Sequence, residues 1–162
     1  MDILSFESQV LVLGEQLRHR AQRLVTAESC TGGLIAAACT AVAGSSDWFE
    51  RGYVTYSNLA KTQMLGVPEA SIEAHGAVSE AVALAMVQGA LRHASAQWAV
   101  AVTGIAGPGG AVTGKPVGTV WVAWAAEDRT WAEHFLLPGD RGQVRAATVQ
   151  RALQGLLTAL AV

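Results

Sequence analysis

The stretch TAESCTGG, at positions 26–33, constrains this chain more than any other. It starts within a short apolar run, which predicts a strand, and an alanine-rich segment that predicts a helix follows from Leu34. An acid, hydroxyls, a thiol and two glycines therefore lie where a strand turns into a helix. The N-terminus of a helix presents unpaired N–H groups, which suit an anion or a developing oxyanion. Alternatively, Ser29 and Thr31 only cap the helix, and Gly32 and Gly33 only form a tight turn.

The length and charge of the chain limit what it can be. With 162 residues, 51% of them apolar, it can bury one substantial core, so we predict a single domain over residues 1–162. The net charge of −2 gives no basic surface for nucleic acid or an anionic membrane. The first residues lack the basic region of a signal peptide, and the longest uncharged apolar run, 34–42, is too short to span a bilayer. We therefore expect a cytoplasmic protein with neither nucleic-acid nor membrane partners.

Hydrophobic periodicity and turn residues divide the chain into alternating helices and strands. The last two strands form a hairpin around Glu127 and Asp128, which interrupts a pure βαβ repeat. This order predicts an α/β fold, a three-layer α/β/α sandwich with a mixed β-sheet. The expected helices are 3–19, 34–42, a short one carrying Lys61, 79–91 and 141–160, and the expected strands are 24–27, 52–56, 98–102, 117–125 and 130–136, with a loop over 68–76 and another over 103–116.

Three loops that follow strands carry the polar residues of a possible site. In open α/β sheets ligands bind at the carboxyl ends of strands, so loops 28–33, 56–61 and 103–110 form one pocket if these ends share an edge. Ser29 is the candidate nucleophile, and no histidine is placed to activate it. A lysine buried among apolar groups has a lowered pKa, so Lys61 is the candidate base, with Tyr56 relaying or donating a proton beside it. Alternatively, Lys61 is solvated, and Tyr56 is a packing residue whose hydroxyl contacts solvent.

Other reactive groups receive weaker support. Cys30 is a rival nucleophile, although a buried structural cysteine is the simpler interpretation. The four histidines show no ligand spacing with one another or with the cysteines, so we predict no metal and no cofactor. Residues 109–115 match the spacing of a nucleotide triphosphate loop, but Pro116 replaces the magnesium-binding hydroxyl and a strand follows. Tyr56 and Lys61 are five residues apart, which does not fit the tyrosine–lysine pair of short-chain dehydrogenases.

Two arginines begin the last predicted helix. Cations in the first turns of a helix oppose its dipole, so Arg141, just after the Asp140 cap, suggests a compensating bound anion such as a phosphate. Arg145 follows one turn later. The alternative is that both are ordinary solvated side chains.

Taken together, the motifs resemble the carboxy-terminal domain of the competence/damage-inducible protein CinA and its stand-alone nicotinamide mononucleotide amidohydrolases. They cover nearly the whole chain in the family's order. The only mismatch in the pocket region is segment 111–114, which is less charged than the family pattern. The matching motifs are AESCTGG at 27–33, AGSSDWFERGYVTYSN at 43–58 with Lys61, HGAVSE at 75–80, TGIAGPGG at 103–110, KPVGTVW at 115–121 and PGDR at 138–141.

The resemblance implies hydrolysis of the carboxamide of nicotinamide mononucleotide, giving nicotinic acid mononucleotide and ammonia in pyridine nucleotide salvage. It implies a metal-independent serine mechanism, with Ser29 attacking and Tyr56 and Lys61 assisting. N–H groups around residues 31–33, or the Ser46 hydroxyl, would hold the oxyanion, and the loop 103–110 with Arg141 would bind ribose and phosphate. The substrate-binding set expected on this basis is Thr31, Gly32, Gly33, Ser46, Asn58, Thr103, Gly104, Ala106, Gly107 and Arg141.

Two other functions stay open at this stage. The chain is alternatively a non-catalytic nucleotide-binding or competence-related partner domain, or an amidase that acts on another small phosphorylated carboxamide. The presence of Ser29, Tyr56 and Lys61 together favours an enzyme, since a binding module needs no buried amine beside a hydroxyl. The small-residue helix 34–42 and the five tryptophans favour a homo-oligomer.

Overall fold

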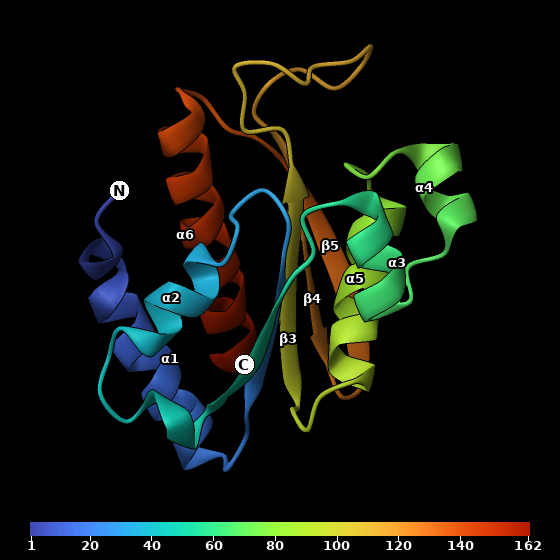
Figure 1. The fold of residues 1–162 in the computed structure, drawn as a ribbon. Helices are drawn as coiled ribbons and strands as arrows, with labels where there is room; N and C mark the ends of the chain where they lie inside the picture. The colour runs from blue at the N-terminus through green and yellow to red at the C-terminus, as the bar shows by residue number, and fades with distance from the viewer.

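A five-stranded mixed β-sheet forms the middle of the molecule (Figure 1). The computed structural model describes all residues, 1–162. The strand order is β2-β1-β3-β4-β5, in which β1 runs parallel to β2 and β3, whereas β4 is antiparallel to both β3 and β5. The predicted mixed sheet and its terminal hairpin are therefore confirmed. The strands are β1 Leu24–Glu28, β2 Phe49–Val54, β3 Trp98–Gly104, β4 Thr119–Ala126 and β5 Arg129–Leu136.

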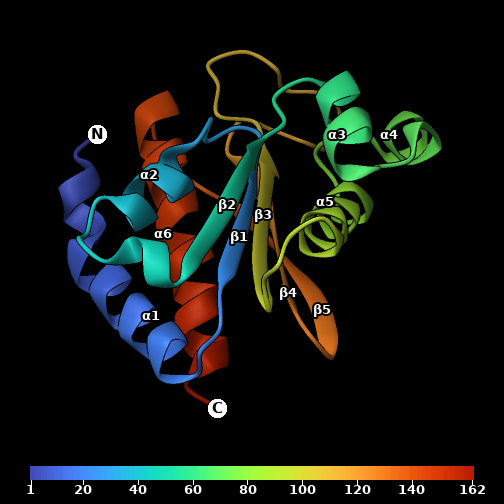
Figure 2. The same cartoon turned by 60° about the horizontal axis from the view of Figure 1, so that its bottom comes forward.

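Helices cover both faces of this sheet, which confirms the predicted three-layer sandwich. On one face lie α1 Glu7–His19, α2 Leu34–Thr40 and α6 Arg141–Leu160, and on the other lie α3 Asn58–Leu65, α4 Glu69–His75 and α5 Glu80–Arg92 (Figures 1 and 2). Short 3-10 helices at Ile3–Phe6 and Ser45–Asp47 precede α1 and β2. None of the helices combines the length and the apolar character that crossing a bilayer requires.

Alternate residues of each inner strand supply two separate hydrophobic cores. In β3, Val100 and Val102 pack with α1 and α6, whereas Ala99 and Ala101 face α5 on the opposite side. All these side chains are fully buried. The continuous apolar sequence of β3 is thus explained by coverage of both faces of the sheet.

Side-chain caps fix where three helices begin. Ser57 Oγ accepts from the N–H of Ala60 at the start of α3, and Ser79 caps α5 in the same way. Asp140 forms a capping box with Gln143, so α6 begins at Arg141 as predicted. These caps set the helical positions of Lys61 and Arg141.

Several predicted boundaries were wrong, including those of one loop, one strand and one helix. The expected loop 68–76 contains helix α4, because Pro68 and Gly76 lie at its two caps rather than inside an irregular segment. Strand β2 begins at Phe49 and ends at Val54, since its pairing with β1 starts from Leu24. Helix α2 stops at Thr40, and one side of it is only half buried.

Candidate active site

Three parallel strands end at one edge of the sheet, and their loops enclose a pocket. The carboxyl ends of β1, β2 and β3 lie together because these strands run in the same direction. The pocket has a volume of about 200 Å³. Eight of the predicted site residues line it together with three that were not in the predicted set: Ser29, Tyr56, Asn58, Lys61, Thr103, Gly104, Ala106 and Arg141, with Cys30, Ala77 and Val78.

Lys61 reaches the base of this pocket from α3. Its Nζ lies 3.0 Å from Ser29 Oγ, 3.0 Å from the carbonyl oxygen of Thr55 and 3.2 Å from that of Tyr56. The side chain is 1% exposed, and neither of the two ion pairs in the protein involves it. The solvated alternative for Lys61 is therefore wrong, and the amine is held beside the serine hydroxyl.

Burial lowers the pKa of Lys61 below its ordinary value of 10.5. The main cause is desolvation, and Lys61 forms no ion pair that would stabilise the ammonium form. A neutral amine donates its two N–H groups to the carbonyls of Thr55 and Tyr56, which leaves its lone pair for the Ser29 O–H. The arrangement therefore suits proton removal from Ser29.

Cys30 lies beside Ser29 but in a different environment. It is 6% exposed, and burial raises the pKa of its thiol to about 12. A thiol with this pKa is protonated near neutral pH and is a poor nucleophile. This supports the interpretation of Cys30 as a packing residue.

Tyr56 and Arg141 bridge the rim of the pocket. Arg141 donates from Nη2 to the Tyr56 hydroxyl at 3.2 Å and from Nη1 to the Gly107 carbonyl at 2.8 Å. The Tyr56 side chain is 62% exposed and contacts Arg141 rather than Lys61, which instead binds its backbone carbonyl. Tyr56 is thus held at the pocket rim, and its hydroxyl forms no hydrogen bond with Lys61 or Ser29.

Residues 31–33 shape the turn after Ser29 rather than line the pocket. Thr31 is fully buried, and its hydroxyl donates to Glu28 at 2.6 Å. The Gly32 N–H donates to the Ser29 carbonyl at 3.0 Å, and Gly33, the N-cap of α2, has a φ of +106°. The N–H groups of Cys30, Thr31 and Gly33 donate to no other residue, and of these three residues only Cys30 lines the pocket.

The buried carboxylate of Glu28 holds this turn to the next helix. It accepts hydrogen bonds from the N–H groups of Ile35 at 2.8 Å and Ala36 at 3.1 Å, in addition to the Thr31 hydroxyl. It therefore satisfies the first amides of α2, where an acid stabilises a helix. Nothing in the sequence indicates this role of the acid.

The structure does not bring Ser46 to the pocket. It is exposed in the 3-10 helix that precedes β2, whereas the pocket lies beyond the far end of that strand. A strand of six residues is roughly 20 Å long. The expected contribution of the Ser46 hydroxyl to the oxyanion site is therefore wrong for this arrangement of the chain.

The segment between α4 and α5 was missed as part of the site. Ala77 and Val78 line the pocket, and the Thr103 hydroxyl donates to the Ala77 carbonyl at 2.9 Å. The sequence carried two signals, the family motif HGAVSE at 75–80, which contains both residues, and the Ser79 cap, which places a turn just before α5. Neither indicates what that turn contacts.

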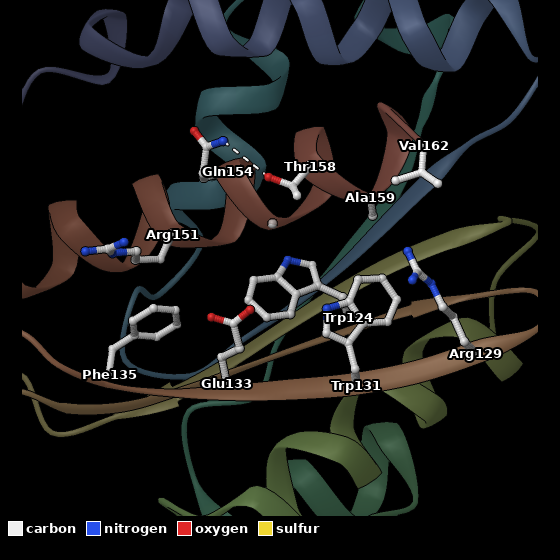
Figure 3. A pocket seen from close by; sticks show the side chains of 11 residues that line it. Trp124, Arg129, Trp131, Glu133, Phe135, Arg151, Gln154, Thr158, Ala159 and Val162 are labelled. Atoms are coloured by element: carbon white, nitrogen blue, oxygen red, sulfur yellow. Dashed lines mark hydrogen bonds between the residues drawn. The ribbon is translucent and has the colours of Figure 1, made fainter.

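A second cavity, of about 320 Å³, lies between β5 and α6 (Figure 3). Trp124 and Trp131 stack there with ring centroids 5.9 Å apart, and the guanidinium groups of Arg129 and Arg151 lie over Trp131 and Phe135. No serine, cysteine, lysine or histidine lines it. It therefore contains no counterpart of the Ser29–Lys61 pair.

Comparison with known proteins places the chain in a family. Residues 7–160 match the family described as the CinA C-terminal domain. The chain belongs to this family. This CinA-family protein is 56% identical over 145 residues to the nicotinamide-nucleotide amidohydrolase PncC of Pseudomonas putida, covering 90% of this chain and 91% of that protein. It is 52% identical over 157 residues to the PncC of Shigella flexneri, covering 93% and 94%.

Solved structures share its fold. The competence damage-inducible protein A of Klebsiella pneumoniae has a TM-score of 0.93 and 41% identity, with 96% of each chain covered. The competence/damage inducible protein CihA of Agrobacterium tumefaciens has a TM-score of 0.93 and 44% identity, with 97% of this chain and 96% of that chain covered. The α/β architecture of the CinA-family protein is therefore that of its structural relatives.

Proposed function

We propose that this protein hydrolyses the carboxamide of nicotinamide mononucleotide to nicotinic acid mononucleotide and ammonia, a step of pyridine nucleotide salvage. The observation that carries the proposal is the 3.0 Å contact between the buried Lys61 amine and the Ser29 hydroxyl. Relatives that are 56% and 52% identical and match over nine-tenths of the chain are named nicotinamide-nucleotide amidohydrolases. The names of these relatives support nicotinamide mononucleotide as the substrate, and the contact between Lys61 and Ser29 supports a serine mechanism.

The reaction proceeds through an acyl-enzyme. Neutral Lys61 takes the proton of Ser29 as Oγ attacks the carboxamide carbon, and the resulting oxyanion accepts a hydrogen bond from the Cys30 N–H. The Lys61 ammonium then protonates the departing nitrogen, so ammonia leaves and Lys61 is neutral again. A water molecule, deprotonated by Lys61, attacks the ester and releases the carboxylate and Ser29.

The rim of the pocket supplies the phosphate site. Arg141 occupies the first position of α6, where helix N–H groups and a guanidinium together suit an anion. Its contacts with Tyr56 and Gly107 hold it across the rim. Asn58, Thr103, Gly104 and Ala106 form the walls against which the nicotinamide ring and ribose lie.

The first test is ammonia release from nicotinamide mononucleotide in the presence of a chelator. Ser29→Ala and Lys61→Met should each lower kcat by at least about a thousand-fold, since each removes half of the nucleophile–base pair. Cys30→Ala is the matched control, because it alters the neighbouring thiol and should leave most of the activity. If Cys30→Ala abolishes turnover while Ser29→Ala retains it, the assignment of the nucleophile is wrong.

The same assay separates the other two functions. A folded wild-type protein that binds nicotinamide mononucleotide without releasing ammonia is a binding module. An amidase for another phosphorylated carboxamide would release ammonia faster from that compound.

The phosphate site has its own test. Arg141→Met should raise KM for nicotinamide mononucleotide roughly 10- to 100-fold, because charge-assisted hydrogen bonds to the phosphate are lost. KM for nicotinamide riboside, which has no phosphate, should change little. An equal rise in KM for both compounds would contradict a phosphate contact at Arg141.

A single domain over residues 1–162, a homo-oligomer and a cytoplasmic location remain predictions from the sequence. Three of the five tryptophans, Trp48, Trp98 and Trp124, are buried within the protomer. They therefore give no support to the expected assembly. Analytical ultracentrifugation of the purified protein tests the homo-oligomer.

A further inference from the structure

Arg145 makes two contacts with the turn that carries Ser29. From α6, one helical turn after Arg141, its Nε donates to the Cys30 carbonyl at 3.1 Å and its Nη2 donates to the Thr31 carbonyl at 3.2 Å. Hydrogen bonds from a guanidinium are stronger than neutral ones, and the planar group fixes two acceptors at once. No carboxylate forms an ion pair with Arg145, so its charge is directed at backbone oxygens alone.

The two carbonyls belong to consecutive peptide units of one tight turn. Gly32 N–H donates to the Ser29 carbonyl at 3.0 Å, which closes a β-turn over residues 29–32. Cys30 and Thr31 both have negative φ, as in a type I turn. The Cys30 carbonyl is the central peptide of this turn, which is the peptide that rotates when such turns change type.

Because trans peptides are planar, the contacts of Arg145 also restrict the orientation of the peptide next to Ser29. In each peptide the N–H points opposite to the C=O, so a fixed Thr31 carbonyl orients the Gly32 N–H toward the Ser29 carbonyl. The bonded Ser29 carbonyl in turn orients the N–H of Cys30 in the opposite direction. That N–H donates to no other residue, and the contact that it makes with the thiol of Cys30 itself is with a weak acceptor.

We infer that Arg145 is a positioning residue, which holds the Cys30 N–H in place as the donor to the developing oxyanion. The inference rests on the proposed acyl transfer at Ser29. Arg145 acts through the backbone and does not touch the substrate. Oxyanion donors are effective because they are oriented before charge develops, and removing one costs roughly 10²- to 10³-fold in kcat. A variant that keeps the Cys30 N–H but no longer fixes its orientation should therefore lose a smaller factor in kcat.

Glu28 fixes the same turn from the other side. Its carboxylate holds the Thr31 hydroxyl and the first amides of α2, whereas Arg145 holds the backbone carbonyls. The turn therefore keeps its fold without Arg145, and only the freedom of its peptides increases. For this reason a variant at Arg145 is informative where a variant at Glu28 would disrupt α2.

The experiment compares Arg145→Met and Arg145→Lys with Arg151→Met, an exposed control in the same helix. Steady-state kinetics are measured with nicotinamide mononucleotide and with nicotinamide riboside, and thermal unfolding shows that each variant is folded. Arg145→Met should lower kcat about 10- to 100-fold for both compounds with KM within about two-fold. Arg145→Lys should recover part of this loss, because one ammonium reaches one carbonyl but not both. Arg151→Met should match the wild type.

A second readout does not depend on the substrate. A fluorophosphonate that labels Ser29 places a phosphoryl oxygen where the oxyanion forms, so its labelling rate should fall in Arg145→Met by a factor similar to that of kcat. If the wild type releases no ammonia but its labelling still depends on Arg145, the proposed function fails and the inference holds. If Arg145→Met and Arg145→Lys are folded with unchanged kcat and labelling, the inference is wrong. A rise in KM confined to nicotinamide mononucleotide would also overturn it, since Arg145 would then bind the phosphate.

Discussion

The protonation of Lys61 sets the pH range in which this site can work. Desolvation lowers the pKa of Lys61 below 10.5, and only the neutral amine can take the proton of Ser29. We therefore expect kcat/KM of the wild type to rise with pH along an acidic limb whose midpoint lies below 10.5. The pH profile of ammonia release measures it. A limb that persists unchanged in the residual activity of Lys61→Met would belong to another group.

The same residue makes stability depend on pH. Between the lowered pKa of folded Lys61 and 10.5 the unfolded chain binds the proton more strongly, so the free energy of unfolding should rise with pH across this window. The rise is about 1.4 kcal/mol for each unit by which the pKa is lowered. Urea unfolding of the wild type and of Lys61→Met at several pH values measures it as a difference between the two proteins. A difference that is flat or falls with pH would contradict a lowered pKa.

At the scale of elements, α6 both carries the two arginines of the site and packs closely on the sheet. Gly155 allows this approach, because a Cβ at this position would lie 2.2 Å from the ring of Trp124, which is fully buried (Figure 3). The ring cannot move aside, since it stacks on Trp131 and donates from Nε1 to the Ala152 carbonyl. We expect Gly155→Ala to destabilise the protein by about 1–3 kcal/mol, despite the better helix propensity of alanine.

The control for this prediction lies in the same helix. At Gly142 the nearest atom to a new Cβ is Asp140 Oδ1 at 3.5 Å, so Gly142→Ala should be neutral or stabilise by up to about 1 kcal/mol. Chemical denaturation of both variants gives the comparison. Equal effects of the two substitutions would show that helix propensity, not contact with Trp124, decides the outcome.

At the scale of the whole molecule, the two cores share the same strands. Val100 and Ala101 are neighbours in β3 but belong to different cores, so neither core survives loss of the sheet. We expect one cooperative unfolding transition, with far-ultraviolet circular dichroism and tryptophan fluorescence changing together. Trp48 and Trp124 report on one core and their surroundings, whereas circular dichroism reports on all helices. Transitions that separate by several degrees would contradict a single cooperative unit.

The order of elements could be predicted because it depends on local patterns. Short runs rich in apolar and β-branched residues indicated the strands. Ser57, Ser79 and Asp140 indicated the helix starts by a chemistry that acts within three residues. The helix α4 was missed because proline and glycine, here Pro68 and Gly76, occur at the ends of short helices as well as in loops. The Ser29–Lys61 pair was predicted from residue chemistry and from the rule that parallel strands end together.

By itself, the sequence determined the fold class and the family, and it predicted Ser29 and Lys61 as nucleophile and base, because periodicity, caps and residue chemistry are local properties. Only the tertiary structure decided that Lys61 is buried, that Ser46 lies away from the pocket and that Arg145 binds the turn after Ser29. Desolvation depends on every element packed around an amine, and the last contact joins residues 115 positions apart in the chain. Neither the desolvation of Lys61 nor the contact of Arg145 with the turn can be read from the spacing of neighbouring residues.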